Sequence, residues 1–481
     1  MAKFNAKKAA VIALAGLMMA QTALTGCGKK TVDYDLENNS GKGNGENSGE
    51  SDRAGIGGKL GVPESCNETI DVGNSTLGSI KINCENIQTP DADKMNVAHF
   101  TPYIVTKEDK KRVAEALFEK DKGIYLYDYE NLPKSELQEM LDSYKQQIES
   151  AQESGDDGWV SYLEEEINDL EQQLASAPDT YPDAGDYSGE GFIGTIGDIE
   201  YSLGMSSYGG DNEDEEGMIG MGSYIYFGPK DTLTLRPYEG ASGGYMTEWA
   251  GDGSEETGAN MSSMSAEEAE DIAGKFLADL GITDVVKTTT SDLYWSYYND
   301  VTGEDIAKEI DGYCIVYSKA VAGSPTYNGR IYNVDNLQQN NGWADIPVES
   351  YTLYVYDGKV VQANWQQILG QADSVEENVE LLSYEQIIEK ANTEMGKYYE
   401  KYATRYKNIE FNDVRLTYYM VSDGDKKCKY IPVWVFSQYE ERVDYDGSSQ
   451  PEQIVIMNAM DGTVIDIIEE AKALGCYEEW N

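Results

Sequence analysis

Apolar residues recur at helical spacing behind three similar start signals. Each start is a hydroxyl residue, Thr106, Ser265 or Ser383, followed three positions later by an acid or amide that can close a capping box. After each start the apolar residues step by three and four along one face. In the second segment these are Ala269, Ile272, Ala273, Phe276 and Leu280. The pattern predicts three amphipathic helices, each packed on another element.

Alternating aromatic and β-branched residues follow the second and third helices and predict strands. The predicted strands are 292–298, 312–319, 351–356 and 359–364, and then 414–421, 430–436, 454–457 and 463–467. The last two strands of each tract are joined by Asp-Gly, which is typical of a two-residue hairpin. The shared order predicts structural repeats. Pro432 predicts that its strand is an edge strand or carries a bulge.

Residues 135–175 carry two further apolar stripes at helical spacing. The stripes are Leu137, Leu141, Tyr144, Ile148 and Ala151, and then Val160, Leu163, Ile167, Leu170 and Leu174. Residues 154–158, Ser-Gly-Asp-Asp-Gly, interrupt them, so we predict an inserted antiparallel helical hairpin about 27 Å long. Two interpretations stay open: a protruding contact arm, or a packing element laid along a sheet. The strand-like runs 199–203 and 224–227 are candidates to complete the first sheet.

The closing residues of the third tract resemble a known kind of unit. Residues 454–465 read Ile-Val-Ile-Met-Asn-Ala-Met-Asp-Gly-Thr-Val-Ile, which is similar to the Asn-Ala-x-Asp-Gly phrase that closes PepSY-type units of exported Firmicute proteins. The resemblance covers about the last 220 residues. It implies an α+β fold of two to three helix-on-antiparallel-sheet, PepSY-like units. Such units are thought to act as inhibitory or regulatory modules for peptidases and as extracellular sensors.

The amino terminus has the layout of a secretory signal. Lysines precede an apolar run from Ala9 to Ala20 that is too short to span a membrane, and residues 24–27 read Leu-Thr-Gly-Cys. This phrase resembles the lipobox of bacterial lipoproteins, which implies cleavage before Cys27 and a diacylglyceryl lipid on its thiol. The whole layout also resembles an uncharacterised clostridial lipoprotein family classed as a domain of unknown function. The resemblance implies that the protein is anchored to the cell membrane of a Gram-positive bacterium, on the extracytoplasmic face.

Composition and spacing divide the rest of the chain. After the signal peptide 1–26, residues 27–58 are almost free of large apolar side chains, which predicts a disordered tether. The remainder is long enough for two or three domains. We expect an N-terminal α+β domain at 59–258, which carries the hairpin, and PepSY-like units at 259–375 and 376–481.

The charge balance bears on the partners. With 87 Asp and Glu residues against 37 Lys and Arg residues, the formal net charge is -50. Such a surface repels phosphate backbones, so nucleic acid is not expected as a partner. The excess acid is explained by solubility outside the cell, with cation binding or a basic protein partner as the alternatives.

The cysteines predict no complete disulfide framework. Five remain beside Cys27, at scattered positions. Cys66 and Cys84 could close a small loop ahead of the first domain. Cys314 lies in a strand-like run and is expected to be a buried strand residue.

Few catalytic chemistries fit the residues present. A single histidine, His99, cannot supply a zinc site of two or three imidazoles, so a structural role is expected. Residues 240–244 match the nucleophile-elbow pattern, but that turn needs a preceding strand, a following helix and a later histidine, so we regard the match as false. The acidic run 211–216 lacks the glycine of a calcium loop and predicts a solvated loop. No cofactor, metal ligand or catalytic residue is predicted.

These features favour a non-enzymatic binding, sensing or regulatory lipoprotein with a protein, peptide or glycan partner outside the cell. Two alternatives remain open. A glycan hydrolase that uses two carboxylates is set by their separation in space, which a sequence does not show. A solute-binding receptor would need two doubly wound lobes, an order of elements that differs from helix followed by meander.

Overall fold

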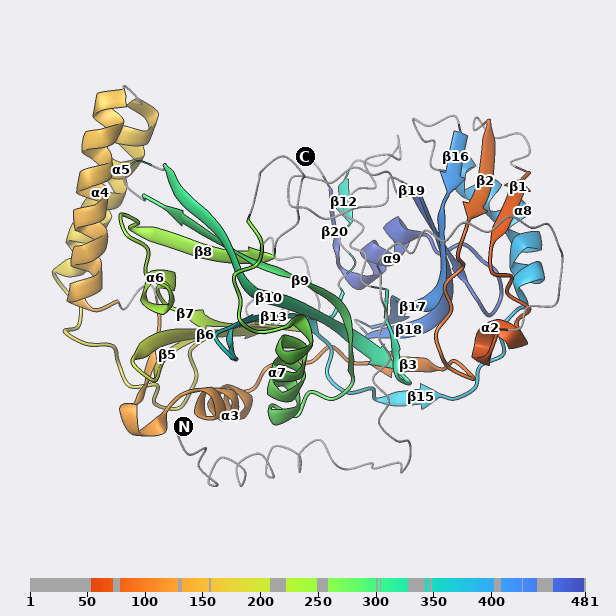
Figure 1. Cartoon of the computed structure of the whole chain (residues 1–481), viewed down its shortest axis with the longest axis horizontal. Coiled ribbons are helices and arrows are strands. Elements are labelled where there is room, and N and C mark those ends of the chain that lie inside the picture. Colours follow the sequence, from red (N-terminus) through yellow and green to blue (C-terminus); the bar gives the residue numbers. More distant parts are fainter. Residues whose placement is uncertain are drawn as a thin grey trace.

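The computed structural model describes residues 53–71, 78–128, 132–154, 157–207, 222–248, 258–299, 302, 304–327, 342–344, 346, 348–401, 408–425, 427–438 and 453–479. Within them the chain is mixed α+β and consists mostly of sheets, as predicted for the fold class. Two antiparallel sheets lie side by side, with helices packed against both (Figure 1). No described helix is both long and apolar enough to cross a membrane.

The larger sheet has ten strands, all paired antiparallel. In order across the sheet they are β4 (Ile124–Leu126), β5 (Gly191–Ile196), β6 (Ile199–Ser207), β7 (Ser223–Pro229), β14 (Lys359–Ile368), β13 (Ser350–Tyr356), β10 (Asp305–Val321), β9 (Val285–Tyr298) and β8 (Gly243–Glu248), with β11 (Ser324–Pro325) beside β10. Helices α3 (Lys107–Leu117) and α7 (Ala266–Asp279) share one apolar core with this sheet. The short helix α6 (Thr232–Leu235) packs against a second, smaller core.

The other sheet has five strands and is built largely from the last quarter of the chain. Its strands are β15 (Ser374–Glu376), β3 (Val97–Phe100), β18 (Lys427–Gln438), β17 (Asp413–Gly424) and β19 (Gln453–Asn458). Its core also takes in α2 (Gly55–Lys59), α8 (Tyr384–Lys401), α9 (Ile467–Leu474) and a small sheet of β1 (Cys66–Ile70), β2 (Ser79–Cys84) and β16 (Asn408–Phe411). Two further strands, β12 (Gly342–Ala344) and β20 (Tyr477–Glu479), pair with each other.

The sheets join segments that are distant in the sequence. Phe227 of β7 lies opposite Ala363 of β14, so the larger sheet continues across the boundary predicted at residue 258. Strand β3 pairs with β18 and β15, which places residues 97–100 with the C-terminal part of the chain. Pairing satisfies backbone N–H and C=O groups that a free edge of β7 or β14 would leave without partners.

The three predicted helix starts are confirmed. The side chains of Thr106, Ser265 and Ser383 each accept a hydrogen bond from the backbone N–H three residues later, and the acid or amide at that position closes the capping box. The Asp357-Gly358 turn between β13 and β14 is also confirmed. Its φ values of 49° and 72° are the positive pair that a two-residue hairpin needs.

The strand predicted at 463–467 is wrong. Only Val464 pairs there, through a single bridge to Met457, and helix α9 begins at Ile467. The Asp466 side chain accepts a hydrogen bond from the backbone N–H of Glu469 and so caps that helix. This local cap outweighs the β-branched residues before it.

The prediction for Pro432 is also wrong. Strand β18 is an interior strand, and its pairing with β17 is regular at Pro432. On the other side the neighbour changes at this point, because pairing with β3 ends at Tyr430 and pairing with β19 begins at Val433. The Pro432 carbonyl accepts a hydrogen bond from Ala459 at 3.0 Å on that side. The missing N–H therefore faces the gap between two strands and breaks no ladder bond.

A buried ion pair lies where the two sheets meet. The Glu349 side chain is fully buried, and it accepts hydrogen bonds from the Tyr351 hydroxyl and from the Leu369 backbone N–H. Lys319, near the end of β10, is 3% exposed at its side chain, and its Nζ lies 3.5 Å from the Glu349 carboxylate. The same Nζ lies 5.5 Å from the ring centre of Phe100, which belongs to the five-stranded sheet. The charges thus lie at the seam between the sheets.

Candidate functional site

Two long helices, α4 (Lys134–Ser154) and α5 (Asp157–Leu174), lie side by side at one end of the molecule (Figure 1). Leu137, Leu141 and Leu170 form their common core with Leu132. The partly buried residues around this core come from the same two helices and from the segments that flank them. The pair therefore packs mainly on itself. We refer to residues 134–174 as the α4–α5 arm.

Polar contacts fix the base of the arm. Lys230, next to the end of β7, forms an ion pair with Glu136 of α4, and its Nζ lies 3.8 Å from the Glu200 carboxylate. The same Nζ lies 5.2 Å from the centre of the Tyr181 ring. The backbone N–H of Lys134 donates to a carbonyl at residue 178 at 2.9 Å, so the two ends of the arm are adjacent. These contacts hold its first turn against the larger sheet.

Two exposed aromatic side chains lie near the start of α5. Trp159 is 45% exposed and Tyr162 is 47% exposed, which is unusual for large apolar rings. Their ring centroids are 5.0 Å apart with an interplanar angle of 18°, so the rings are stacked. Positions three apart share a helix face, which explains the contact. Leu163, which follows Tyr162, is fully buried, whereas neither aromatic ring belongs to the core cluster of the arm.

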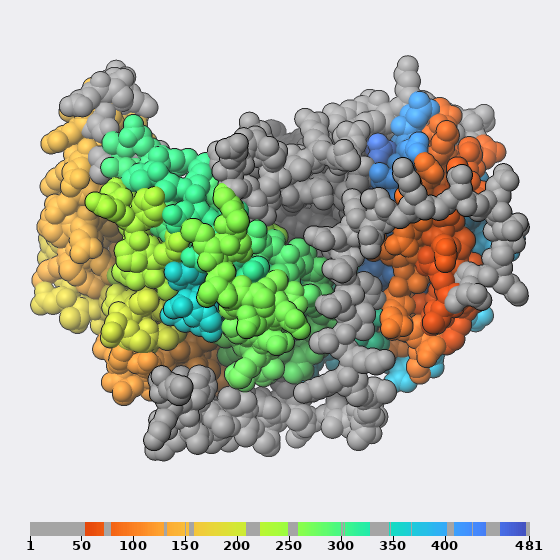
Figure 2. Space-filling model, in the orientation of Figure 1, coloured from red at the N-terminus to blue at the C-terminus, as the bar shows by residue number. Residues whose placement is uncertain are grey.

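The arm is strongly acidic. Residues 134–174 contain twelve Asp and Glu residues and two lysines. Both lysines are engaged within the region, Lys145 with Glu171 at 3.1 Å and Lys134 with Asp179 at 2.7 Å. The arm forms the left margin of the molecule in Figure 2, where its surface is seen in orange and yellow. An aromatic pair in such a field suits a partner that carries positive charge.

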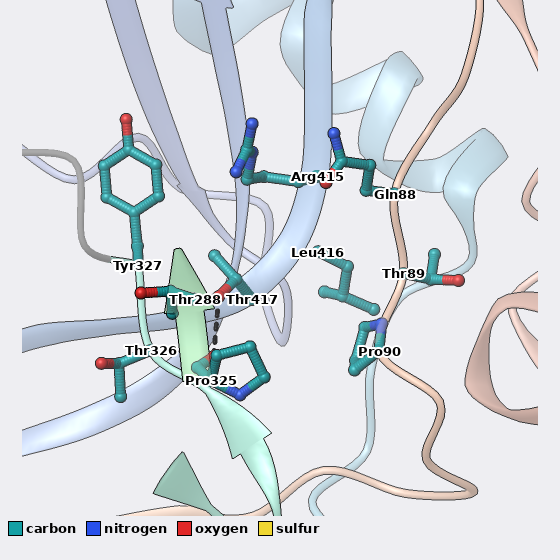
Figure 3. A pocket seen from close by; sticks show the side chains of 10 residues that line it. All are labelled: Gln88, Thr89, Pro90, Thr288, Pro325, Thr326, Tyr327, Arg415, Leu416 and Thr417. Carbon is teal, nitrogen blue, oxygen red and sulfur yellow. Dashed lines mark hydrogen bonds between the residues drawn. The ribbon is translucent and has the colours of Figure 1, made fainter. Parts of the chain in front are cut away.

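A small pocket lies at the seam between the sheets (Figure 3). It is lined by residues 88–90, by Thr288 of β9, by 325–327 and by 415–417 of β17. Its volume is about 60 Å³, far below the several hundred Å³ of a typical small-molecule site. The guanidinium of Arg415 makes two hydrogen bonds to Asp413 at 2.8 and 2.9 Å, which balances its charge. The pocket has room for a few water molecules but not for a glycan or a peptide.

His99 lies at a junction of three segments. Its Nδ1 is 2.7 Å from Asp423 and its Nε2 is 2.9 Å from Glu376. The hydrogen bond to Asp423 is the largest cause of a raised pKa at His99. Lys429 lies 3.0 Å from the other oxygen of Asp423. Both ring nitrogens are thus engaged with carboxylates, and the ring links β3 to β15 and to the end of β17.

The predicted site residues fall in several places. Cys27 and the acidic run 211–216 lie outside the described residues. Cys66 and Cys84 are free thiols that lie directly opposite each other on β1 and β2. Cys314 is fully buried in β10, as predicted. Among the described residues no group of three or more His, Cys, Asp and Glu side chains is arranged to hold a metal ion.

The match to a nucleophile elbow at residues 240–244 is false, as predicted. The segment leads into β8, which begins at Gly243, whereas the elbow needs a strand before it and a helix after it.

Two features escaped the sequence. A pattern that marks only which positions are apolar does not show that Trp159 and Tyr162 are exposed. Their spacing of three residues does indicate that the two rings share a helix face and can be in contact. The pairing of Lys319 with Glu349 joins positions in different strands, and no local signal marks it.

Comparison with known proteins gives little. No family model matches the chain, and no curated protein matches it. A solved structure of an uncharacterized protein from Eubacterium rectale ATCC 33656, a crystal structure at 1.45 Å resolution, is similar over 84% of this chain and 94% of that chain. The two are 13% identical, and the TM-score is 0.33. A likeness of this size assigns neither fold nor function to the chain.

Proposed function

We propose that this chain is a lipid-anchored extracytoplasmic protein that binds a protein or peptide partner through the α4–α5 arm. The observation that carries the proposal is the stacked, exposed pair of Trp159 and Tyr162. Exposed Trp and Tyr side chains are the residue types that most often supply binding energy at interfaces. The core of the arm is formed by its own helices and the segments that flank them, so the arm does not serve to cover either sheet.

The location rests on the amino-terminal sequence. The apolar run and the Leu-Thr-Gly-Cys phrase at 24–27 support cleavage before Cys27 and attachment of a lipid to its thiol. The part of residues 27–58 that precedes α2 would serve as the tether between membrane and fold, because Ile56 of α2 is buried in the core. A sensor anchored in this way would pass any signal on through its partner.

The framework behind the arm is, in this proposal, a set of PepSY-like units. The support is a helix followed by an antiparallel meander, which occurs in both tracts with a different number of strands. Helix α7 precedes β9, β10, β13 and β14, each paired with the next, with the short strands β11 and β12 between β10 and β13. Helix α8 precedes β16, which pairs with β2, and then β17, β18 and β19, each paired with the next. The arm would be an insertion between β4 and β5 of the larger sheet, and the framework would position it.

Deleting the arm tests the binding proposal. Because the backbone N–H of Lys134 is hydrogen bonded to the carbonyl of residue 178, the two flanks of residues 135–175 are adjacent, and a short Gly-Ser linker can join them when this segment, Glu136 included, is removed. Cells that make the full chain or the deletion variant are treated with a chemical cross-linker, and the captured partners are identified. We expect the deletion variant to keep the thermal unfolding of its sheets and to lose partner capture. Unchanged capture, or a protein that no longer folds, would contradict the contact-arm proposal.

Replacing Cys27 with serine tests the anchoring separately. We expect C27S to appear in the medium instead of the membrane fraction, and a fatty-acid label to be lost from the protein. A wild-type chain that carries no lipid would refute the anchoring and leave the arm proposal intact. Purified mature protein that cleaved a wall glycan, and lost this activity on substitution of one carboxylate, would favour the enzyme alternative.

A further inference from the structure

Cys66 and Cys84 form a cross-strand pair. They are register partners in the antiparallel pair of β1 and β2, and both side chains are buried, 7% and 3% exposed. Directly opposite residues in an antiparallel pair have Cα atoms about 4.5 or 5.5 Å apart. A disulfide bond requires Cα atoms about 4.4–6.8 Å apart. Both kinds of opposite position therefore fall within the range that a disulfide can bridge.

The two thiols also lie on the same face of the small sheet. Along β2, Ile80, Ile82 and Cys84 are buried, whereas the residues between them are exposed. Cys66 is buried at the start of β1, and its Sγ lies 3.9 Å from the Ile82 carbonyl oxygen. Side chains of opposite residues in a sheet project to the same side. The two sulfur atoms therefore share one apolar layer.

We infer that Cys66 and Cys84 join as a disulfide bond when the chain folds in an oxidising environment. In the reaction the two thiols give up two protons and two electrons to an external disulfide such as oxidised glutathione, which leaves as two thiols. Burial raises the pKa of both thiols, so the thiolate that attacks is scarce in the folded protein. The bond therefore forms more readily before β1 packs against the core.

The other cysteines lack this arrangement. Cys314 is buried in the larger sheet, in a strand whose register partners there are Tyr354 and Ser291. Cys428 of β18 has Ser422 and Phe100 as its register partners, and Cys476 follows the end of α9. Register thus selects one pair among the five described cysteines.

The bond would hold together β1 and β2, two strands near the amino-terminal end of the described fold. It would close a loop between positions 66 and 84 and fix β1 to β2. Strand β2 pairs in parallel with β16, from the C-terminal part of the chain. The first strand of the described fold, β1, would then be covalently held to β2, which contributes to the core of the five-stranded sheet.

The pairing can be tested without reference to export or to the arm. Purified full chain is unfolded in urea with reductant and refolded in a glutathione redox buffer. Remaining thiols are trapped with N-ethylmaleimide, and peptides are identified by mass spectrometry before and after reduction. We expect Cys66 and Cys84 to be protected until reduction, while Cys314 reacts in denaturant. Reaction of both Cys66 and Cys84 before reduction, or linkage of Cys428 to Cys476 in their place, would overturn the inference.

Thermal unfolding supplies the second measurement. A loop of this length predicts that the oxidised protein melts about 3–7 °C above the reduced protein. We expect C66S to melt at one temperature in both buffers and to release a reactive thiol at Cys84. The matched variant C314S should keep the full difference between oxidised and reduced protein. A wild-type protein with the same melting temperature in the oxidising and the reducing buffer would contradict the inference.

Discussion

Replacing Lys319 with methionine should destabilise the protein strongly, because it leaves a carboxylate buried without its cation. The Lys319 side chain is 3% exposed and lies between Asp284, at 2.6 Å, and Glu349, at 3.5 Å. Methionine fills a similar volume, so the loss is mainly electrostatic. Glu349 would keep only its hydrogen bonds from Tyr351 and from the backbone at Leu369. Breaking a buried ion pair on one side costs about 3–5 kcal/mol, and we expect K319M to fall in that range.

Removing the charge on the other side should cost less. In E349Q the amide keeps an oxygen for the Leu369 N–H, and Lys319 keeps Asp284 as a partner. We expect a loss of about 1–2 kcal/mol, the size of a weakened hydrogen-bond set. The double variant K319M/E349Q should be more stable than K319M alone, because it leaves no buried charge at Glu349.

Urea unfolding followed by tryptophan fluorescence measures these differences. Trp365 in the larger sheet and Trp434 in the five-stranded sheet are both almost fully buried, so the signal reports on both sheets. Each variant is compared with the wild type at the same pH and salt concentration. The slope of the unfolding free energy against urea concentration should be the same in all variants. A loss below 1 kcal/mol in K319M, or a larger loss in E349Q than in K319M, would refute the reasoning.

Further predictions concern single sites. The pKa of His99 is raised above 6.5, first by its hydrogen bond to Asp423, so the protonated ring stabilises the fold below pH 6.5, and this contribution is lost as the pH rises through the folded-state pKa. The free energy of unfolding should therefore fall more steeply from pH 6 to pH 9 in the wild type than in H99Q, and equal slopes would contradict this. S265A removes a helix cap and should cost about 1 kcal/mol in urea unfolding, with no change expected if the cap is idle. G312A should cost about 2 kcal/mol or more, because φ is +105° and a Cβ would lie 2.4 Å from a backbone oxygen, whereas the matched G358A has open space and should cost about 1 kcal/mol.

Local signals carried most of what the sequence could predict. A cap such as Ser265 depends on a residue three positions away, so the residues that determine the helix start lie within one short segment. The strands of the two tracts follow from alternation in the same way. The strand expected at 463–467 failed for a local reason as well, since the cap at Asp466 competes with β-branched neighbours.

The pairing of distant segments could not be predicted. Nothing near Phe227 marks Ala363 as its neighbour across the sheet, and nothing near residues 97–100 marks β18. Such choices depend on which edges remain free once every local element has formed. The same holds for the arm. Its helices follow from their apolar stripes, whereas the exposure of Trp159 depends on what the rest of the chain leaves uncovered.

The exposed aromatic pair offers the most direct test of the proposed function. The measurement is the yield of cross-linked partner on intact cells for W159A/Y162A, with Y245A as the control, because Tyr245 is a similarly exposed aromatic residue, 49% exposed on β8, outside residues 134–174. Loss of two interface aromatics costs about 2–4 kcal/mol in binding, so we predict at least a tenfold lower yield for the double variant and an unchanged yield for Y245A. Equal yields from the wild type and W159A/Y162A, at equal protein levels and equal melting temperature, would contradict the claim that the arm binds the partner.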